Sequence, residues 1–212
     1  MIDLSARLSK NGLRVSGVLT PEPADGLAER FKTLVLISPS EPAFWDIFSA
    51  SNEALDGAPD PVDRWSRRVI GSLACDLGGK AYFPFGGPPH RPFYSWALRS
   101  GSVAASPVSL LVDGTAGLFV SFRGALALPD DVQTSLPPPP CNTCIDRPCT
   151  TACLASALNQ DGYNVPACHR WLDTPNGETC LAGGCLVRRT CPVGAANRPE
   201  QQSSYFMRQF HK

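Results

Sequence analysis

The feature that most constrains this chain is a concentration of cysteines toward its C-terminal end. Eight of its nine cysteines fall between positions 141 and 191, and only Cys75 lies outside that segment. Thiolates are soft ligands, and cysteines at such density usually hold zinc or an iron–sulfur cluster. Disulfides are the other common explanation, but they belong mainly to secreted proteins. The first residues show no apolar run of the kind found in signal peptides, which favours a cytoplasmic protein with reduced thiols.

The spacing of the cysteines divides them into an upstream run and a downstream run. The upstream run follows the pattern C-x2-C-x4-C-x3-C and consists of Cys141, Cys144, Cys149 and Cys153. The downstream run ends in a C-P dipeptide and consists of Cys168, Cys180, Cys185 and Cys191. Two-cluster ferredoxins have the pattern C-x2-C-x2-C-x3-C-P, whose fourth cysteine binds the other cluster. The upstream run is that pattern with two additional residues.

The same exchange of the fourth cysteine assigns ligands to two [4Fe–4S] clusters. Cluster one is then held by Cys141, Cys144, Cys149 and Cys191. Cluster two is held by Cys153, Cys168, Cys180 and Cys185. This count uses all eight cysteines. The alternative is two zinc sites of four cysteines each, although zinc ribbons usually carry paired C-x2-C knuckles and only one such pair is present.

Residues beside these cysteines suggest how a cluster would be surrounded. Gly183 and Gly184 would let the backbone approach inorganic sulfide and donate N–H bonds to it. Arg188 and Arg189 could offset cluster charge, or they could be solvated surface arginines. His169 could donate to sulfide or cover the cluster. We expect Cys75, which has no second cysteine nearby, to be a packed structural thiol.

Four consecutive prolines mark the clearest boundary in the chain. Residues 137–140 favour an extended linker, because proline cannot donate a backbone hydrogen bond. We therefore expect an α+β sheet domain over 1–136, a two-cluster ferredoxin-like domain over 141–195 and a polar C-terminal tail over 196–212.

Hydrophobic patterning in the N-terminal part mixes helix and strand signals. We expect helices over 2–10 and 41–55 and strands over 13–20, 33–38, 109–112 and 117–122. The strongest helix signal begins at Asp60-Pro61, with Asp60 as the N-cap and an apolar stripe on one face. That stripe consists of Val62, Trp65, Val69, Ile70, Leu73 and Leu77.

From Cys141 to Cys191 the sequence resembles the cluster domain of epoxyqueuosine reductases and related cobalamin-linked reductases. The stretch CNTCIDRPCTTACLASAL is similar to the family's four-cysteine run, VPACHRWL to its isolated cysteine, and CLAGGCLVRRTCPVG to its closing motif. In that family the first three cysteines and the last share one cluster. The resemblance therefore implies the same ligand sets as the spacing.

A weaker resemblance extends upstream. The stretch GLFVSFRGALALP, residues 117–129, resembles these reductases and the cobalamin-processing proteins of the flavin-reductase/nitroreductase-like group. It implies a sheet domain that binds a corrinoid or a flavin, for which Phe83, Phe85, Phe93, Tyr94 and Trp96 could form an aromatic pocket, unless they pack in the core. His90 could contact such a cofactor or be a plain loop histidine. The stretch FGGPPHRPF has no carboxylate where the family has its proton-donating aspartate, so the epoxyqueuosine reaction is not inferred.

Three functions remain open at this point. The first is a cytoplasmic electron-transfer protein with two [4Fe–4S] clusters that serves a redox partner protein. The second is an oxidoreductase whose N-terminal domain binds a corrinoid or flavin reduced through the clusters. The third is a zinc-stabilised interaction module. The chain has 19 Lys and Arg against 19 Asp and Glu, which argues against a nucleic-acid partner, and no run approaches the roughly 20 apolar residues of a membrane span.

Overall fold

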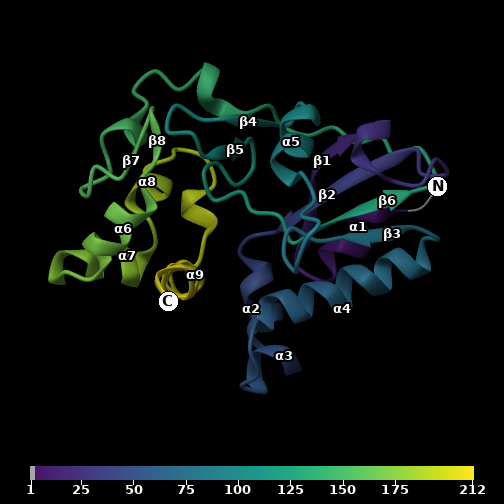
Figure 1. The fold of residues 1–212 in the computed structure, drawn as a ribbon, viewed down its shortest axis with the longest axis horizontal. Helices are drawn as coiled ribbons and strands as arrows, with labels where there is room; N and C mark the ends of the chain where they lie inside the picture. The colour runs from purple at the N-terminus through teal and green to yellow at the C-terminus, as the bar shows by residue number, and fades with distance from the viewer. Residues whose placement is uncertain (1–2) are drawn as a thin grey trace. The chain divides into compact units, whose positions relative to one another are not determined.

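The computed structural model describes residues 3–212, which contain nine α-helices and three small sheets (Figure 1). The expected mixture of helices and strands is confirmed. The chain divides into two compact units. The first comprises the chain through Val103 together with Ser121–Leu136, and the second comprises Ala104–Val120 together with Pro137–Lys212. None of the helices in the described part of the chain is long and apolar enough to cross a membrane.

The first unit is built on a four-stranded antiparallel sheet. Its strand order is β1-β2-β6-β3, formed by β1 (Leu13–Leu19), β2 (Thr33–Pro39), β6 (Gly124–Leu128) and β3 (Lys80–Tyr82). Every residue of β2 and β6 is buried, which explains the continuous apolar runs in both segments. The strands expected near 13–20 and 33–38 are therefore confirmed. The strand β6 was not expected from the sequence.

The helix α4 (Pro61–Asp76) packs against β3 and β6 and covers one face of this sheet (Figure 1). All six residues of the expected apolar stripe are buried. Two expectations about this segment were wrong. Asp60 has a left-handed backbone with φ of 52° and its side chain does not cap the helix. Cys75 is exposed on α4 and is not packed.

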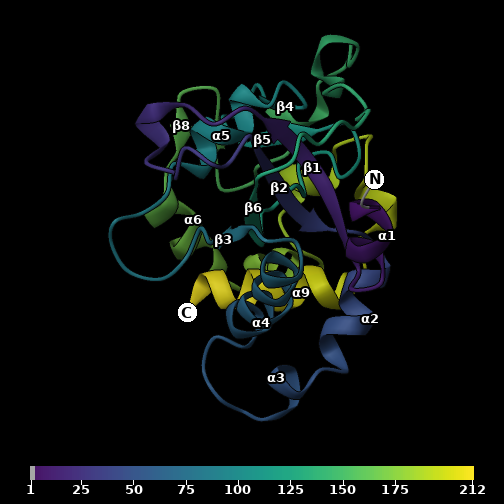
Figure 2. The same ribbon diagram turned by 90° about the vertical axis from the view of Figure 1, so that its right-hand side faces the viewer.

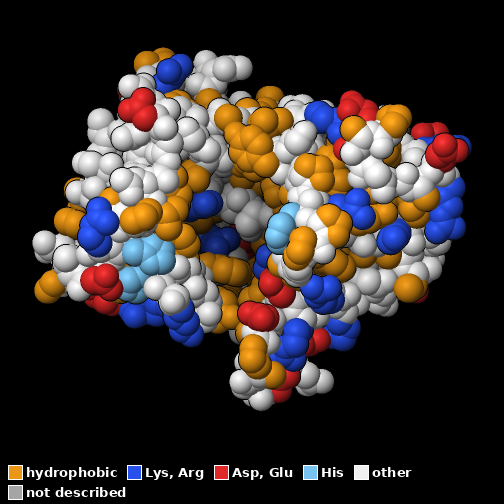
Figure 3. All heavy atoms as spheres, in the orientation of Figure 1, with side chains coloured by type: hydrophobic (Ala, Val, Ile, Leu, Met, Phe, Trp, Pro, Cys, Tyr) orange, Lys and Arg blue, Asp and Glu red, His pale blue; other side chains and the backbone are white. Residues whose placement is uncertain are grey.

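Four shorter helices complete the first unit: α1 (Leu4–Ser9), α2 (Ala43–Ser49), α3 (Asn52–Leu55) and α5 (Phe93–Arg99). The helix expected over 41–55 is interrupted between α2 and α3, because Ser51 adopts an extended backbone and its Oγ accepts a bond from Ala54 N–H. In Figure 3 basic and acidic side chains lie side by side around α3, where Arg64 pairs with Asp56 and Arg68 pairs with Glu53.

A buried carboxylate ties α5 to the turn after β1. Asp25 is only 6% exposed. Its Oδ1 accepts bonds from Trp96 Nε1 at 2.8 Å and Arg99 Nη1 at 2.7 Å, and its Oδ2 accepts one from Glu22 N–H at 2.8 Å. Burial alone would raise the pKa of Asp25, but the bonds from Arg99, Glu22 and Trp96 outweigh it and hold that pKa below its usual value. Both carboxylate oxygens of Asp25 therefore accept hydrogen bonds, as a buried charge requires.

The second unit contains short elements connected by turns. Its helices are α6 (Val165–Leu172), α7 (Glu178–Gly183), α8 (Leu186–Arg189) and α9 (Glu200–His211). Its strands form two small ribbons: β5 (Leu111–Asp113) pairs with β4 (Val103–Ala105), where the chain enters the unit, and β7 (Leu158–Asn159) pairs with β8 (Gly162–Tyr163).

The segment expected to be a polar tail is the helix α9, visible along its length in Figure 2. It packs against α7 and brings Met207 onto Cys180 and Leu181. Small residues allow this contact, since a Cβ added at Gly184 would lie 2.8 Å from the Cβ of Ser203. The polar composition of residues 196–212 gave no indication that this segment forms a helix packed against α7.

The segment Ala104–Val120, which the sequence analysis placed in the N-terminal domain, belongs to the second unit. Its Val108, Val112 and Leu118 pack with Cys149, Val187 and Cys191 in one apolar core. The strand expected over 109–112 overlaps β5 only at Leu111 and Val112, because Ser109 has a left-handed φ of 61°. The strand expected over 117–122 is not found, because Gly117 turns the chain with a left-handed φ of 56°.

Candidate metal centre

Two short 3-10 turns position the first cysteines of the segment. Cys141 lies in the turn Pro140–Asn142 and Cys149 in the turn Pro148–Thr150, each with proline in its first turn. A threonine hydroxyl closes each turn: Thr143 donates to Pro140 O at 3.1 Å and Thr150 donates to Arg147 O at 2.9 Å. These turns therefore fix the backbone at Cys141 and Cys149 without the help of a bound ligand.

The residues that lengthen the ferredoxin-like run form an outward loop. Ile145 is 93% exposed, and Arg147 adopts a left-handed backbone with φ of 41°. The chain thus projects into solvent between Cys144 and Cys149. The additional residues change the loop without separating the cysteines on either side.

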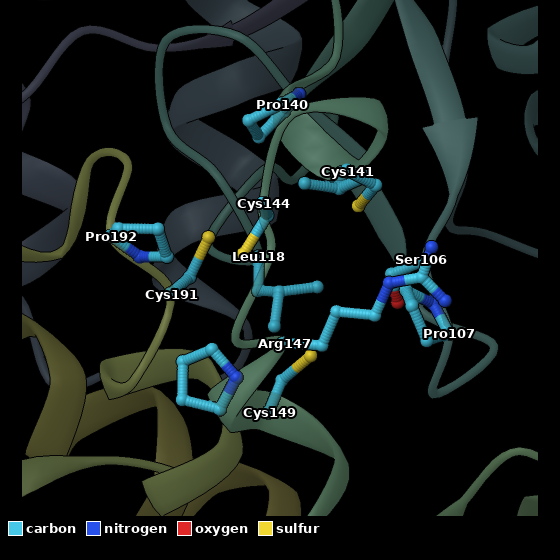
Figure 4. Close-up of a pocket in the computed structure, with 12 residues that line it drawn as sticks. Ser106, Pro107, Leu118, Pro140, Cys141, Cys144, Arg147, Cys149, Cys191 and Pro192 are labelled. Atoms are coloured by element: carbon cyan, nitrogen blue, oxygen red, sulfur yellow. The ribbon is translucent and has the colours of Figure 1, made fainter.

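Cys141, Cys144, Cys149 and Cys191 line one hollow, and Figure 4 shows their sulfur atoms around it. The cavity volume is about 20 Å³, enough for one water molecule, so the lining side chains nearly fill the hollow. The remaining lining residues are Ser106, Pro107, Val112, Leu118, Pro140, Arg147, Pro148 and Pro192. The four cysteines are those that the spacing assigned to cluster one, although Cys191 is far from the others in sequence.

Two glycines let the backbone approach this hollow closely. A Cβ added at Gly117 would lie 2.7 Å from Cys191 Sγ and would collide with Val193 O. One added at Gly194 would collide with the backbone of Ala116. Both glycines have positive φ, of 56° and 76°, which other residues rarely adopt. The segments 114–118 and 191–194 therefore lie against each other only because both carry glycine.

The other four cysteines form a second group in the same unit. Cys168 lies on α6, Cys180 on α7 and Cys185 immediately before α8. Cys168 and Cys185 pack against a small apolar cluster that contains Cys180, and Cys185 shares a second apolar cluster with Cys153. Asn164 Oδ1 caps α6 by accepting a bond from Ala167 N–H at 3.0 Å. These are the four residues that the spacing assigned to cluster two.

The two groups border a common apolar core. Cys149 and Cys191 from the first group are buried in it, and Cys153 and Cys185 from the second group pack against it. Cys185 also packs against the smaller apolar cluster around Cys180 and Leu181. Cofactors at the two groups would therefore be close neighbours.

The environment favours neutral thiols in the absence of a metal. Burial raises the pKa of Cys141, Cys149, Cys168 and Cys180, and the neighbouring cysteines raise it further. The N–H of Leu186 works in the opposite direction on Cys180. A metal cofactor binds thiolates, so binding would displace these protons and remove the repulsion between the sulfurs.

Charged and polar side chains surround the two groups differently. Arg147 beside the first group is exposed. Arg188 follows Cys185 on α8 and is partly buried, and its guanidinium donates to O of Leu118, which lines the hollow of the first group. Burial raises the pKa of the Tyr163 hydroxyl above its usual value. No sequence signal identified Tyr163 or Gly117, because neither lies in a cysteine motif.

Four cysteines around an apolar hollow supply the donor set that a [4Fe–4S] cubane or a tetrahedral zinc ion requires. Four thiolates around one zinc ion lie about 3.8 Å apart, from a tetrahedron with Zn–S near 2.3 Å. In a cubane each thiolate binds a different iron, so the sulfurs surround a larger volume. Within residues 3–212, no three His, Cys, Asp or Glu side chains converge closely enough to hold one metal ion. The donor set by itself therefore fits either kind of centre.

The other residues weighed from the sequence lie in ordinary settings. His90 is exposed. Phe93 and Trp96 are buried in the core, whereas Tyr94 is 52% exposed. The rings of Phe83 and Phe85 contact each other at a tilt of 35°, with the Arg67 guanidinium over both. The ring of His169 contacts Phe210 at 4.7 Å between centroids, so His169 helps to fasten α9 to α6.

No protein-family model, no curated protein and no solved structure matches this chain. The resemblance to cobalamin-linked reductases therefore stays an expectation.

Proposed function

We propose that this protein is an iron–sulfur electron-transfer protein whose second unit is a ferredoxin-like holder of two [4Fe–4S] clusters. The observation that carries the proposal is the distribution of the cysteines. Four of them surround one hollow, and the other four pack against two apolar clusters that share Cys185, although each set draws on both halves of the segment. Thiolate sets of this composition are the ligands of two-cluster ferredoxins.

The shared apolar core supports electron transfer as the role of the pair. Two redox centres at the borders of one core can exchange electrons without a moving carrier. Burial and hydrogen bonds to sulfur set the potentials of such centres. The chain residues hold, shield and tune the clusters, which when bound supply the one-electron chemistry to a redox partner protein.

Metal and sulfide analysis of protein purified without oxygen tests the proposal. We expect about eight iron atoms and about eight acid-labile sulfides per chain, with the brown absorption of cubane clusters. The Cys75→Ser variant is the matched control, because Cys75 is exposed on α4 in the first unit, and it should retain the full content. Stoichiometric zinc without sulfide would overturn the proposal and leave a zinc-stabilised module.

A further inference from the structure

One buried hydroxyl at the first group of cysteines has no partner within the described part of the chain. Ser106 is only 7% exposed, and it lines the hollow that the four cysteines surround (Figure 4). Within residues 3–212, no donor or acceptor lies within hydrogen-bond reach of its Oγ, and this includes the cysteine sulfurs. A buried polar group without a partner costs free energy, so such groups usually interact with something that the chain itself does not supply.

The backbone around Ser106 is held in place by its own hydrogen bonds. Ser106 N–H donates to Leu110 O at 2.8 Å, and Ser106 O accepts a bond from Ser109 N–H at 3.0 Å. Between these bonds the side chain of Val108 is fully buried in the apolar core of the unit. The hydroxyl is therefore the one polar group of Ser106 that this turn leaves unused.

The remaining side chains that line the hollow cannot accept a hydrogen bond from this hydroxyl. Apart from the cysteines and Ser106 they are Pro107, Val112, Leu118, Pro140, Arg147, Pro148 and Pro192. All of them are apolar except Arg147, whose guanidinium is a donor only. An acceptor for the Ser106 hydroxyl must therefore come from a group that is bound in the hollow.

The two candidate centres differ in whether they bring such an acceptor. A zinc ion held by four thiolates adds no acceptor atom to the cysteine sulfurs that are already present. A [4Fe–4S] cluster contains inorganic sulfides, which accept hydrogen bonds from donors around the site. The unpaired hydroxyl of Ser106 therefore favours the cluster over the ion.

We propose that the Ser106 hydroxyl donates a hydrogen bond to an inorganic sulfide of a [4Fe–4S] cluster at the first group of cysteines. The reduced cluster carries one more negative charge than the oxidised cluster, so this bond stabilises the reduced form and raises the reduction potential. Ser106 is a positioning and tuning residue, not a ligand. The inference rests on the proposed function, since it requires the cluster to be bound.

The test is a potentiometric titration of the holoprotein, with dithionite as reductant and the EPR signal of the reduced clusters as readout. In Ser106→Ala one couple should move to more negative potential while the other stays in place. The couple that moves should be the one that remains in Cys153→Ser, which keeps only the cluster of the first group. Ser106→Thr keeps the hydroxyl and should stay close to the wild-type potential.

A spectroscopic measurement detects the proposed hydrogen bond directly. In wild-type protein reduced in D2O, deuterium ENDOR should show an exchangeable hydrogen coupled to the cluster of the first group. That coupling should be lost in Ser106→Ala and retained in Ser106→Thr. Ser5→Ala, at an exposed position on α1 in the first unit, makes the same chemical change and should alter neither the spectrum nor the potentials.

The stability of the apoprotein separates this role from a structural one. Because the Ser106 hydroxyl has no partner in the described chain, Ser106→Ala should not lower the free energy of unfolding of the apoprotein in urea. A serine that served only the fold would lower it. The variant should therefore fold and bind both clusters, which the iron and sulfide content verifies.

Several outcomes would overturn the inference. Unchanged potentials and an unchanged ENDOR spectrum in Ser106→Ala would do so, as would a shift confined to the couple that is absent from Cys153→Ser. A shift of equal size in Ser106→Thr would show that packing is responsible. The failure of the proposed function looks different, because a zinc protein without sulfide shows no couples even in the wild type, and it removes the acceptor on which the inference depends.

Discussion

Gly117 faces Cys191 so closely that a Cβ atom at position 117 would lie 2.7 Å from the cysteine sulfur. Gly117 belongs to the segment 104–120, whereas Cys191 closes the cysteine-rich region. The contact joins two stretches of the second unit that are more than seventy positions apart in sequence. Because Gly117 has no side chain, its backbone lies directly beside the sulfur of Cys191, which is a candidate ligand.

Replacement of Gly117 by alanine should destabilise the second unit. The new Cβ would collide with Val193 O and press on Cys191 Sγ, in a left-handed backbone that alanine disfavours. We expect a loss of about 3 kcal/mol in the free energy of unfolding of the apoprotein, measured by urea denaturation with circular dichroism.

Gly57→Ala is the matched control for that variant. Gly57 has a similar φ of 70°, but a Cβ there meets nothing within 4 Å. We expect the free energy of unfolding to fall by only about 1 kcal/mol, because the left-handed backbone is the only feature there that disfavours alanine. Equal losses in the two variants would show that the contact with Cys191 is unimportant.

Removal of single cysteines should remove one cluster at a time. Cys191→Ser should lose the cluster at the first group and keep the other, so about half of the roughly eight iron atoms remain. Cys153→Ser should lose the opposite cluster, although Cys153 is adjacent in sequence to the first group. The measurement is iron and sulfide content together with reduced-state EPR. The same residual EPR spectrum in both variants would contradict the exchange of ligands between the groups.

Asp25 should make the stability of the first unit dependent on acid pH. Because Arg99, Glu22 N–H and Trp96 hold its pKa below 3.8 in the folded state, its contribution is fully present above that pH. The contribution is lost as the pH falls further through the folded-state pKa. Urea unfolding followed by tryptophan fluorescence reports on this unit, which holds Trp45, Trp65 and Trp96.

Asp25→Ala should cost about 3 kcal/mol at neutral pH, because it leaves buried donors without their acceptor. Its unfolding free energy should also depend less on pH in the acid range. Asp56→Ala is the control, since Asp56 pairs with Arg64 at the surface and such pairs contribute little. A neutral effect of Asp25→Ala would refute the role of the network.

The cap of α6 should support the position of Cys168. Asn164→Ala removes the acceptor for Ala167 N–H and should lower the free energy of unfolding by about 1 kcal/mol. Asn176→Ala, at an exposed position in a turn, should change it by less than about 0.5 kcal/mol. Differential scanning calorimetry of the apoproteins measures both. An effect of Asn176→Ala as large as that of Asn164→Ala would contradict the capping argument.

Local sequence determined several elements of this protein. The strand β2 and the helix α4 were predictable because each has a hydrophobic pattern of the right period and length, and burial follows that pattern. The ferredoxin-like exchange of the fourth cysteine also predicted a set of cysteines, Cys141, Cys144, Cys149 and Cys191, that line one hollow in the structure. Close spacing forces neighbouring cysteines onto one turn, whatever surrounds them.

Only the tertiary structure decided the rest. The sequence of residues 104–120 does not indicate that they belong to the second unit, because their apolar side chains could pack equally well in the core of the first unit. The contact of Gly117 with Cys191, the packing of α9 through Ser203 and the burial of Arg188 all join segments distant in sequence. Local propensity reports what a segment can form alone, whereas these features depend on which partner each segment meets after the chain has folded.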